Sequence, residues 1–287
     1  MDIDSIKTIG VVGCGLMGSG IVEACARGGF QVRVREVDET LLKRGLGRVA
    51  ASLAKSVERK RLAQSEMDAA LSHIQGTVVL EDFADCDLVI EAAVENLAEK
   101  KAVFATLDRI TGPEAVLASN TSSLSITEMA AATGRPGQVI GLHFFNPVPA
   151  MPLLEIVRGL RTAEATVDLG RALGARLHKT VVVAPDRPGF FVNLLLIPYL
   201  LDAIRALEGG VGTKEDIDTA IKLGLNHPMG PFALLDFVGL DTCLFIADAM
   251  YAEFRDPRYA APPLLRRMVS AGLLGRKSGE GFYEYDT

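Results

Sequence analysis

Short apolar strands that alternate with amphipathic helices constrain the fold of this 287-residue chain more than any other feature. Helical stretches separate several of the strands, notably Met17–Gly28, Thr40–Lys60 and Asn96–Arg109. Strands and helices that alternate at this spacing predict an α/β domain with a parallel, doubly wound sheet. The expected strands are Lys7–Val12, Gln31–Arg35, Leu88–Glu91, Val116–Ser119, Val139–Phe144, Leu153–Val157 and Thr180–Val183.

The alternation of strands and helices ends after Pro185. From Gly189 onward helical periodicity dominates, and Gly281–Tyr285 is the one segment with the pattern of a strand. The prolines and the glycine of APDRPG mark a boundary between the two patterns. We therefore expect two domains, an α/β domain over residues 1–187 and an all-helical domain over residues 188–287. Pro198 lies in an apolar helical run and is expected to kink that helix or to mark its first turn.

Composition excludes several classes of protein. The net charge is −6 and the basic residues are spread along the chain, which argues against a nucleic-acid partner. No apolar run approaches the ~20 residues of a membrane span, and the N-terminal sequence lacks the basic region of a signal peptide. With neither of these signals, we expect a cytoplasmic protein. The cysteines lack metal-ligand spacing, so we expect reduced, packed thiols and no metal site. These cysteines are Cys14, Cys25, Cys86 and Cys243.

A glycine-rich turn joins the first expected strand to the first expected helix. The segment IGVVGCGLMGSG places Gly13, Gly15 and Gly18 in GxGxxG spacing, within the strand–turn–helix context that makes this motif specific. Gly13 permits the tight turn, Gly15 lets a pyrophosphate approach the backbone, and Gly18 allows close contact of helix and strand. The start of the helix favours an anion. A Rossmann-like dinucleotide-binding domain is therefore expected, with a glycine turn that binds no ligand as the alternative.

The end of the second expected strand indicates which dinucleotide is bound. Glu36 follows this strand, where a carboxylate accepts hydrogen bonds from the adenosine ribose and repels a 2′-phosphate. The sequence therefore predicts NAD rather than NADP. Arg33 and Arg35 keep the alternative open, because an arginine near this position accepts a phosphate.

Two further residues are candidates for proton transfer. Of the four histidines, His143 ends an apolar strand, where catalytic groups of open α/β sheets collect. Its unperturbed pKa near neutrality suits a general base. Glu155 lies in the apolar run MPLLEIV, where a carboxylate is unfavourable unless it is paired. Pairing with His143 would orient the imidazole and stabilise its protonated form. A structural glutamate bonded to the backbone is the alternative.

The expected helix Thr40–Lys60 is rich in basic side chains. The simplest interpretation is a solvated helix face, and the alternative is a phosphate-attracting helix beside the cofactor. These side chains belong to Lys43, Arg44, Arg48, Lys55, Arg59 and Lys60.

Several ordered motifs together resemble one enzyme family along essentially the whole chain. They are GCGLMGSGI, EAAVENLAEK, ASNTSSLSIT, GLHFFNPVPAMPLLEIV, DRPGFFVN, HPMGPFALLDFVGLDT and RKSGEGFYEY. The chain resembles the L-3-hydroxyacyl-CoA dehydrogenases, including the bacterial 3-hydroxybutyryl-CoA dehydrogenases. The resemblance implies an NAD-binding domain followed by a helical domain that mediates homodimerisation.

The resemblance also implies roles for individual residues. The catalytic pair falls on His143 and Glu155. Ser122 and Asn193 would bind the substrate oxygens, with Asn193 contributed by the helical domain to an interdomain site. Contacts to the CoA part of the substrate fall on Ser52 and Arg59. Contacts to the cofactor fall on Gly13, Gly15, Leu16, Met17, Gly18, Glu36, Glu95, Lys100, Ser122 and Asn146, with Glu95 and Lys100 at the nicotinamide half.

The reaction implied is the reversible oxidation of (S)-3-hydroxyacyl-CoA by NAD to 3-ketoacyl-CoA, with a short acyl chain, in fatty acid metabolism. Two alternatives stay open. One is a dehydrogenase of the same architecture that acts on a free hydroxy acid or sugar acid, as crystallin-like relatives do. The other is a non-catalytic NAD-binding protein that kept the fold.

Overall fold

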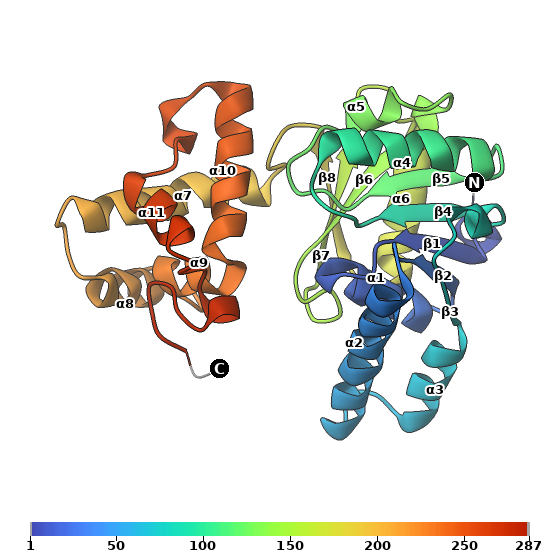
Figure 1. Ribbon diagram of the computed structural model, residues 1–287, viewed down its shortest axis with the longest axis horizontal. Helices are drawn as coiled ribbons and strands as arrows, with labels where there is room; N and C mark the ends of the chain where they lie inside the picture. Colours follow the sequence, from blue (N-terminus) through green and yellow to red (C-terminus); the bar gives the residue numbers. More distant parts are fainter. Residues whose placement is uncertain (1, 286–287) are drawn as a thin grey trace. The chain divides into compact units, whose positions relative to one another are not determined.

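The computed structural model describes residues 2–285 and divides into two compact units (Figure 1). The first unit ends at Arg187 and the second begins at Pro188. The first unit contains a sheet with helices around it, and helices make up most of the second.

The sheet of the first unit has eight strands in the order β3-β2-β1-β4-β5-β6-β7-β8. All neighbouring pairs are parallel except β6 and β7. The expectation of a wholly parallel sheet is therefore wrong at this pair, because a turn joins the two strands and leaves no room for a crossover helix. The bounds are β1 Thr8–Val12, β2 Gln31–Arg35, β3 Ile74–Thr77, β4 Leu88–Glu91, β5 Val116–Ser119, β6 Val139–Phe144, β7 Leu153–Arg158 and β8 Thr180–Pro185.

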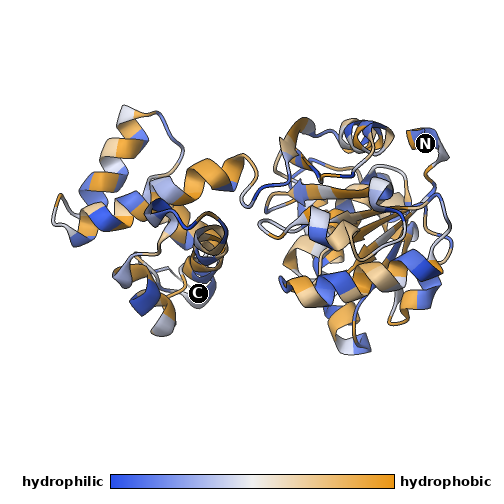
Figure 2. Ribbon diagram, turned by 90° about the horizontal axis from the view of Figure 1, so that it is seen from above, coloured by the Kyte–Doolittle hydropathy of each residue, from blue (hydrophilic) through white to orange (hydrophobic). Residues whose placement is uncertain are grey.

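Six helices of the first unit connect and cover these strands. Strands β4, β5 and β6 are buried along their whole length, as parallel strands are when helices cover both faces of the sheet. Figure 2 shows the resulting apolar interior beneath helices that are polar on their outer sides. The helices are α1 Leu16–Arg27, α2 Glu39–Glu58, α3 Gln64–Ser72, α4 Leu97–Ile110, α5 Ile126–Ala130 and α6 Glu164–Arg176.

Side-chain caps fix where the helices nearest the sheet edge begin. Asp38 accepts a hydrogen bond from the backbone N–H of Leu41 at the start of α2. Asn96 accepts from the N–H of Glu99 at the start of α4. Each cap satisfies one amide that the first turn leaves unpaired, so these residues set the first turns of α2 and α4.

The second unit packs five helices around its own apolar core. Pro198 lies well inside the first of them, beyond its first turn, so the first-turn alternative is wrong. The strand expected at Gly281–Tyr285 is also wrong, and the segment has only isolated bridges. Its N–H groups go elsewhere, because the buried Asp236 accepts from Phe282 N and Tyr283 N, at 2.8 Å each. The helices are α7 Val192–Glu208, α8 Lys214–Gly224, α9 Pro231–Val238, α10 Leu240–Phe254 and α11 Pro263–Ser270.

All four cysteines are free and buried, as the sequence predicted. Burial raises the pKa of the Cys25, Cys86 and Cys243 thiols to about 12, so these thiols stay protonated and unreactive at neutral pH. Among residues 2–285, no group of side chains is arranged to hold a metal ion. No helix in that range combines the length and the apolar character needed to cross a bilayer.

Candidate active site

The predicted site residues of the first unit gather largely at one edge of the sheet. Strands β1, β4, β5 and β6 are parallel, so the loops after their carboxyl ends meet at the same edge. These loops carry the glycine turn, Glu95, Ser122 and Asn146. Between β1 and β4 the chain switches from one half of the sheet to the other. Such a switch point is where open α/β sheets bind a dinucleotide.

Each of the three glycines in the turn occupies its position for a different structural reason. Gly13 has φ +94°, and a Cβ there would lie 2.7 Å from the carbonyl oxygen of Ala92. A Cβ on Gly18 would lie 1.9 Å from the carbonyl oxygen of Gly13. Gly15 has nothing within 4 Å of the corresponding position, and it precedes α1 without a side-chain cap. The turn therefore leaves open backbone and uncapped amides at a helix start, which fits a pyrophosphate.

Glu36 lies at the end of β2, next to this turn. Its Oε1 accepts from Cys14 N at 2.7 Å, and its Oε2 accepts from Val37 N at 3.2 Å. Arg33 and Arg35, the arginines that could accept the 2′-phosphate of NADP, have other partners. Arg33 binds the carboxylate of Asp85 and a backbone carbonyl, and Arg35 donates to the carbonyl of Val78. A carboxylate beside the turn and guanidinium groups held elsewhere favour an unphosphorylated ribose.

We predict that NADH supports turnover at a kcat/KM at least about tenfold above that of NADPH, since each charge-assisted hydrogen bond is worth about 1.5–3 kcal/mol. The Glu36→Ala variant should lose most of this preference, because repulsion of a 2′-phosphate disappears with the carboxylate. Initial rates with each cofactor test both statements. A higher kcat/KM with NADPH in the unmodified enzyme would contradict the role of Glu36.

His143 and Glu155 face each other across the antiparallel pair β6 and β7. They are direct register partners, and His143 Nδ1 lies 2.7 Å from Glu155 Oε2. Glu155 is fully buried and His143 is 6% exposed. An ionised carboxylate has only acceptors, so Nδ1 carries the proton and Nε2 is the basic nitrogen of the neutral imidazole. The pairing expected from the sequence is therefore present, in the arrangement that a general base requires.

A cluster of three charged side chains, two of them buried, lies next to this edge. Lys100 Nζ, on α4, lies 2.6 Å from Glu91 Oε1 and 3.3 Å from Glu95 Oε2. Glu91 is fully buried and also accepts from Ser119 Oγ at 2.7 Å. Lys100 is only 1% exposed, and its expected contact with the nicotinamide half of the cofactor stays a prediction. Its ammonium group is held by carboxylates, and it positions Glu95.

Hydrogen bonds tie the loop that carries Ser122 to its neighbours. Glu95 Oε1 accepts from Ser122 N at 3.1 Å and from the hydroxyl of Thr121. Asn120 Oδ1 accepts from Phe144 N at 2.9 Å, one residue beyond His143. The Ser122 loop is thus fixed both to Glu95 and to the strand of the histidine.

Sequence reasoning missed Glu91 and Asn120 as members of this network. The rule that singled out Glu155 applies equally to Glu91, which is a carboxylate at the end of the apolar strand LVIE. Asn120 carries no comparable signal, because an asparagine after a strand is common in turns of every kind.

A cavity of about 230 Å³ lies beside α1, and we call it the α1–α2 cavity. Ser52 on α2 and the exposed Asn146 after β6 both line it. Arg59 is exposed at the C-terminal end of α2. Asn193 belongs to the second unit, where it lies in the first turn of α7 and is 9% exposed. The remaining lining residues are Leu16, Ser19, Gly20, Glu23, Arg48, Val49, Pro147, Val148 and Pro149.

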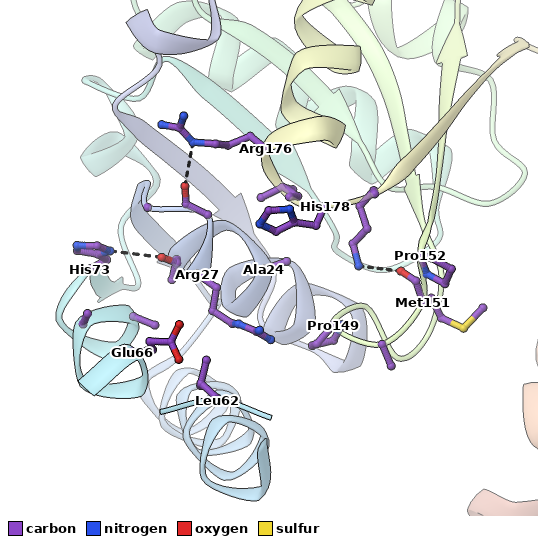
Figure 3. A pocket seen from close by; sticks show the side chains of 18 residues that line it. Ala24, Arg27, Leu62, Glu66, His73, Pro149, Met151, Pro152, Arg176 and His178 are labelled. Atoms are coloured by element: carbon purple, nitrogen blue, oxygen red, sulfur yellow. Dashed lines mark hydrogen bonds between the residues drawn. The ribbon is translucent and has the colours of Figure 1, made fainter. Parts of the chain in front are cut away.

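A second cavity of about 450 Å³ lies at the other end of α1 (Figure 3). Two of its cations bind backbone carbonyls: Arg176 donates to Gly28 O at 3.2 Å, and Lys179 donates to the carbonyls of Val148 and Met151 at 2.6 and 2.7 Å. The third, Arg27, pairs with the Glu23 carboxylate. None of the predicted site residues lines it. These contacts hold α6, α1 and the turn after β6 together.

The strand order, the glycine turn and the buried histidine–glutamate pair at the same edge define a dinucleotide-dependent dehydrogenase. The family model described as the NAD binding domain of 3-hydroxyacyl-CoA dehydrogenase matches residues 8–187, and the model of its C-terminal domain matches residues 189–285. The chain therefore belongs to the 3-hydroxyacyl-CoA dehydrogenase family, which confirms the resemblance seen in the motifs. It is an NAD-dependent oxidoreductase.

Individual relatives are similar over nearly their whole length. A 3-hydroxybutyryl-CoA dehydrogenase of Mycobacterium tuberculosis is 53% identical over 284 residues, which cover 98% of this chain and 99% of the relative. The crystal structure of M. tuberculosis FadB2 matches with a TM-score of 0.97 at 52% identity, covering 99% of this chain and 100% of the other. The (S)-3-hydroxybutyryl-CoA dehydrogenase PaaH1 of Ralstonia eutropha matches with a TM-score of 0.93 at 43% identity, covering 99% and 100%.

Proposed function

We propose that the chain catalyses the reversible, NAD-dependent oxidation of short-chain (S)-3-hydroxyacyl-CoA, with 3-hydroxybutyryl-CoA and acetoacetyl-CoA as the substrate pair. The buried His143–Glu155 hydrogen bond carries this proposal, because oxidation of a carbinol requires a base for the hydroxyl proton. The names of the relatives support the substrate class, since they include 3-hydroxybutyryl-CoA dehydrogenases at about half identity.

In this reaction His143 takes the proton of the C3 hydroxyl through Nε2. Glu155 holds the Nδ1 proton and stabilises the imidazolium that results, so the ring stays in one tautomer and one orientation. When bound, NAD would supply the acceptor for the hydride that leaves C3. In the reverse direction the imidazolium returns its proton to the oxygen of the ketone.

The other predicted residues orient the reactants. Ser122 would hydrogen-bond the reacting oxygen, and its loop is fixed through Glu95. Asn193 would bind a substrate oxygen from the helical domain. Glu95 would contact the nicotinamide half of the cofactor and is held by Lys100. Gly13, Gly15 and Gly18 would hold the pyrophosphate, with the first residues of α1, Leu16 and Met17, beside it.

A substrate comparison tests the proposed reaction. We expect NADH to be oxidised with acetoacetyl-CoA, measured by its absorbance, and kcat/KM to fall as the 3-ketoacyl chain of the substrate lengthens. Free acetoacetate should give no measurable rate, because it lacks the CoA part. Turnover of acetoacetate without turnover of acetoacetyl-CoA would instead identify a hydroxy-acid dehydrogenase. Failure with every acyl-CoA would identify a non-catalytic protein.

We further propose a cytoplasmic homodimer that acts in fatty acid metabolism and associates through the helical unit. The four free, buried thiols suit a reducing compartment. Large apolar side chains are exposed on the helical unit and would be covered by a partner subunit. They belong to Leu195, Val211, Leu223, Leu225, Phe237, Phe245 and Tyr251.

A further inference from the structure

The carboxylate of Asp186 binds three groups at the start of α5. Asp186 directly follows β8, and its Oδ1 accepts from Ile126 N at 2.9 Å. Its Oδ2 accepts from Thr127 N at 2.6 Å and from the hydroxyl of Ser125 at 3.1 Å. Ser125 Oγ in turn accepts from Glu128 N at 3.2 Å. The two side chains therefore satisfy the first three amides of α5, which has only five residues and is too short to be stable on its own.

The start of α5 is also the end of the loop that carries Ser122. Ser125 lies three residues after Ser122. Earlier in the loop, Glu95 accepts from Ser122 N and from the Thr121 hydroxyl. Asp186 is thus a second anchor of this loop, and it comes from a segment 61 residues beyond Ser125 in the chain.

Asp186 also begins the connection to the second unit. Its N–H donates to the carbonyl of Arg158, the last residue of β7, at 3.0 Å, so its backbone and its side chain are both held within the first unit. The chain is bonded again at Gly189, whose carbonyl accepts from Leu194 N in α7 at 2.9 Å. Only two residues lie between Asp186 and Gly189, and the second of them is a proline, whose φ is fixed by its ring. The connection therefore has few free dihedral angles.

We propose that Asp186 is a positioning residue for the dehydrogenase reaction, which ties the Ser122 loop to the start of the connection that leads to Asn193. This inference rests on the proposed function, in which Ser122 and Asn193 bind the substrate oxygens. Asn193 lies seven residues after Asp186, in the first turn of α7. Both residues must hold one substrate at the same time, and a misplacement of about 1 Å can lower a rate by about 10²-fold. The carboxylate of Asp186 faces α5, so it acts through the placement of these two residues and not by contact with the substrate.

Kinetics of the Asp186→Ala variant with NADH and acetoacetyl-CoA test this proposal. We expect kcat/KM to fall by at least about tenfold, while the Kd for NADH stays nearly unchanged because the glycine turn and Glu36 lie on other loops. Asp108→Ala is the matched control. It removes a carboxylate that accepts from Gly134 N at 2.8 Å and from Arg135 Nε at 2.7 Å, beyond the other end of α5. This control should also lower the free energy of unfolding, but it should leave kcat/KM unchanged.

Double variants separate positioning from a purely structural role. In a Ser122→Ala or an Asn193→Ala background, the residue that Asp186 positions is already lost. Asp186→Ala should therefore lower kcat/KM by a smaller factor in either background than in the unmodified enzyme. The same factor in all three backgrounds would overturn the proposal, because Asp186 would then act independently of both residues.

A second change leaves every hydrogen bond of Asp186 in place and tests the proposal even if Asp186→Ala does not fold. Insertion of one glycine between Arg187 and Pro188 lengthens the connection beyond the anchor. It should also lower kcat/KM for acetoacetyl-CoA by at least about tenfold. An unchanged kcat/KM in the insertion variant or in Asp186→Ala would overturn the positioning role. An unmodified enzyme that is inactive on acetoacetyl-CoA would overturn the proposed function instead.

Discussion

Replacing His143 by glutamine should lower kcat for acetoacetyl-CoA reduction by at least two orders of magnitude. Positioned general acid–base catalysis contributes roughly 10²–10⁴-fold, and a glutamine amide does not exchange a proton near neutral pH. The side chain keeps hydrogen-bonding capacity toward Glu155 Oε2, so the loss reports proton transfer more than packing. NADH affinity, measured by quenching of cofactor fluorescence, should be preserved. Steady-state rates with saturating NADH give kcat directly.

A matched control and a double variant sharpen this test. His178→Gln makes the same chemical change at an exposed histidine and should leave kcat unchanged. Glu155→Gln should lower kcat as well, and adding it to His143→Gln should cost less than the two single losses combined, because the pair acts as a unit. Near-normal turnover of His143→Gln, or fully independent losses in the double variant, would remove the pair from the mechanism.

Much of the fold follows from local patterns in the sequence, and the errors have identifiable causes. Strand β3, the segment IQGT, was missed because it is short, contains a glycine and is only half-buried, so it lacks an apolar pattern. The antiparallel direction of β7 is predictable from the length of the connection before it. Fewer than a dozen residues separate β6 from β7, which is too few for the crossover that a parallel pair requires.

Some residues of the candidate site are also predictable from the sequence, and others are not. His143 and Glu155 could be identified because a strand end and a buried carboxylate each demand an explanation. The sequence also predicts that Lys100 is buried. It lies on the same face of α4 as the apolar Leu97, Phe104 and Leu107 rather than on the solvated face. What no local pattern gives is the burial of the Glu23 carboxylate on α1, because it depends on how α1 and α2 pack.

The buried charged cluster leads to the largest expected effect on stability. Replacing Lys100 by methionine should lower the free energy of unfolding by about 3–5 kcal/mol, because it leaves the buried Glu91 carboxylate without its cation. Urea unfolding followed by circular dichroism measures the difference. The adjacent Lys101 is the matched control, since its side chain is 42% exposed and its Nζ lies 3.8 Å from Glu128 Oε2. Lys101→Met should change the free energy by less than about 0.5 kcal/mol.

Neutralising the partner should restore most of the lost stability. In the double variant Glu91→Gln with Lys100→Met, the amide carbonyl still accepts from Ala93 N, and the amide nitrogen donates to Ser119 Oγ. No uncompensated charge then remains at that position, so the double variant should be more stable than Lys100→Met alone. Equal losses for Lys100→Met and Lys101→Met would show that the cluster contributes nothing specific. A double variant less stable than Lys100→Met would show that the loss comes from packing rather than from an unpaired carboxylate.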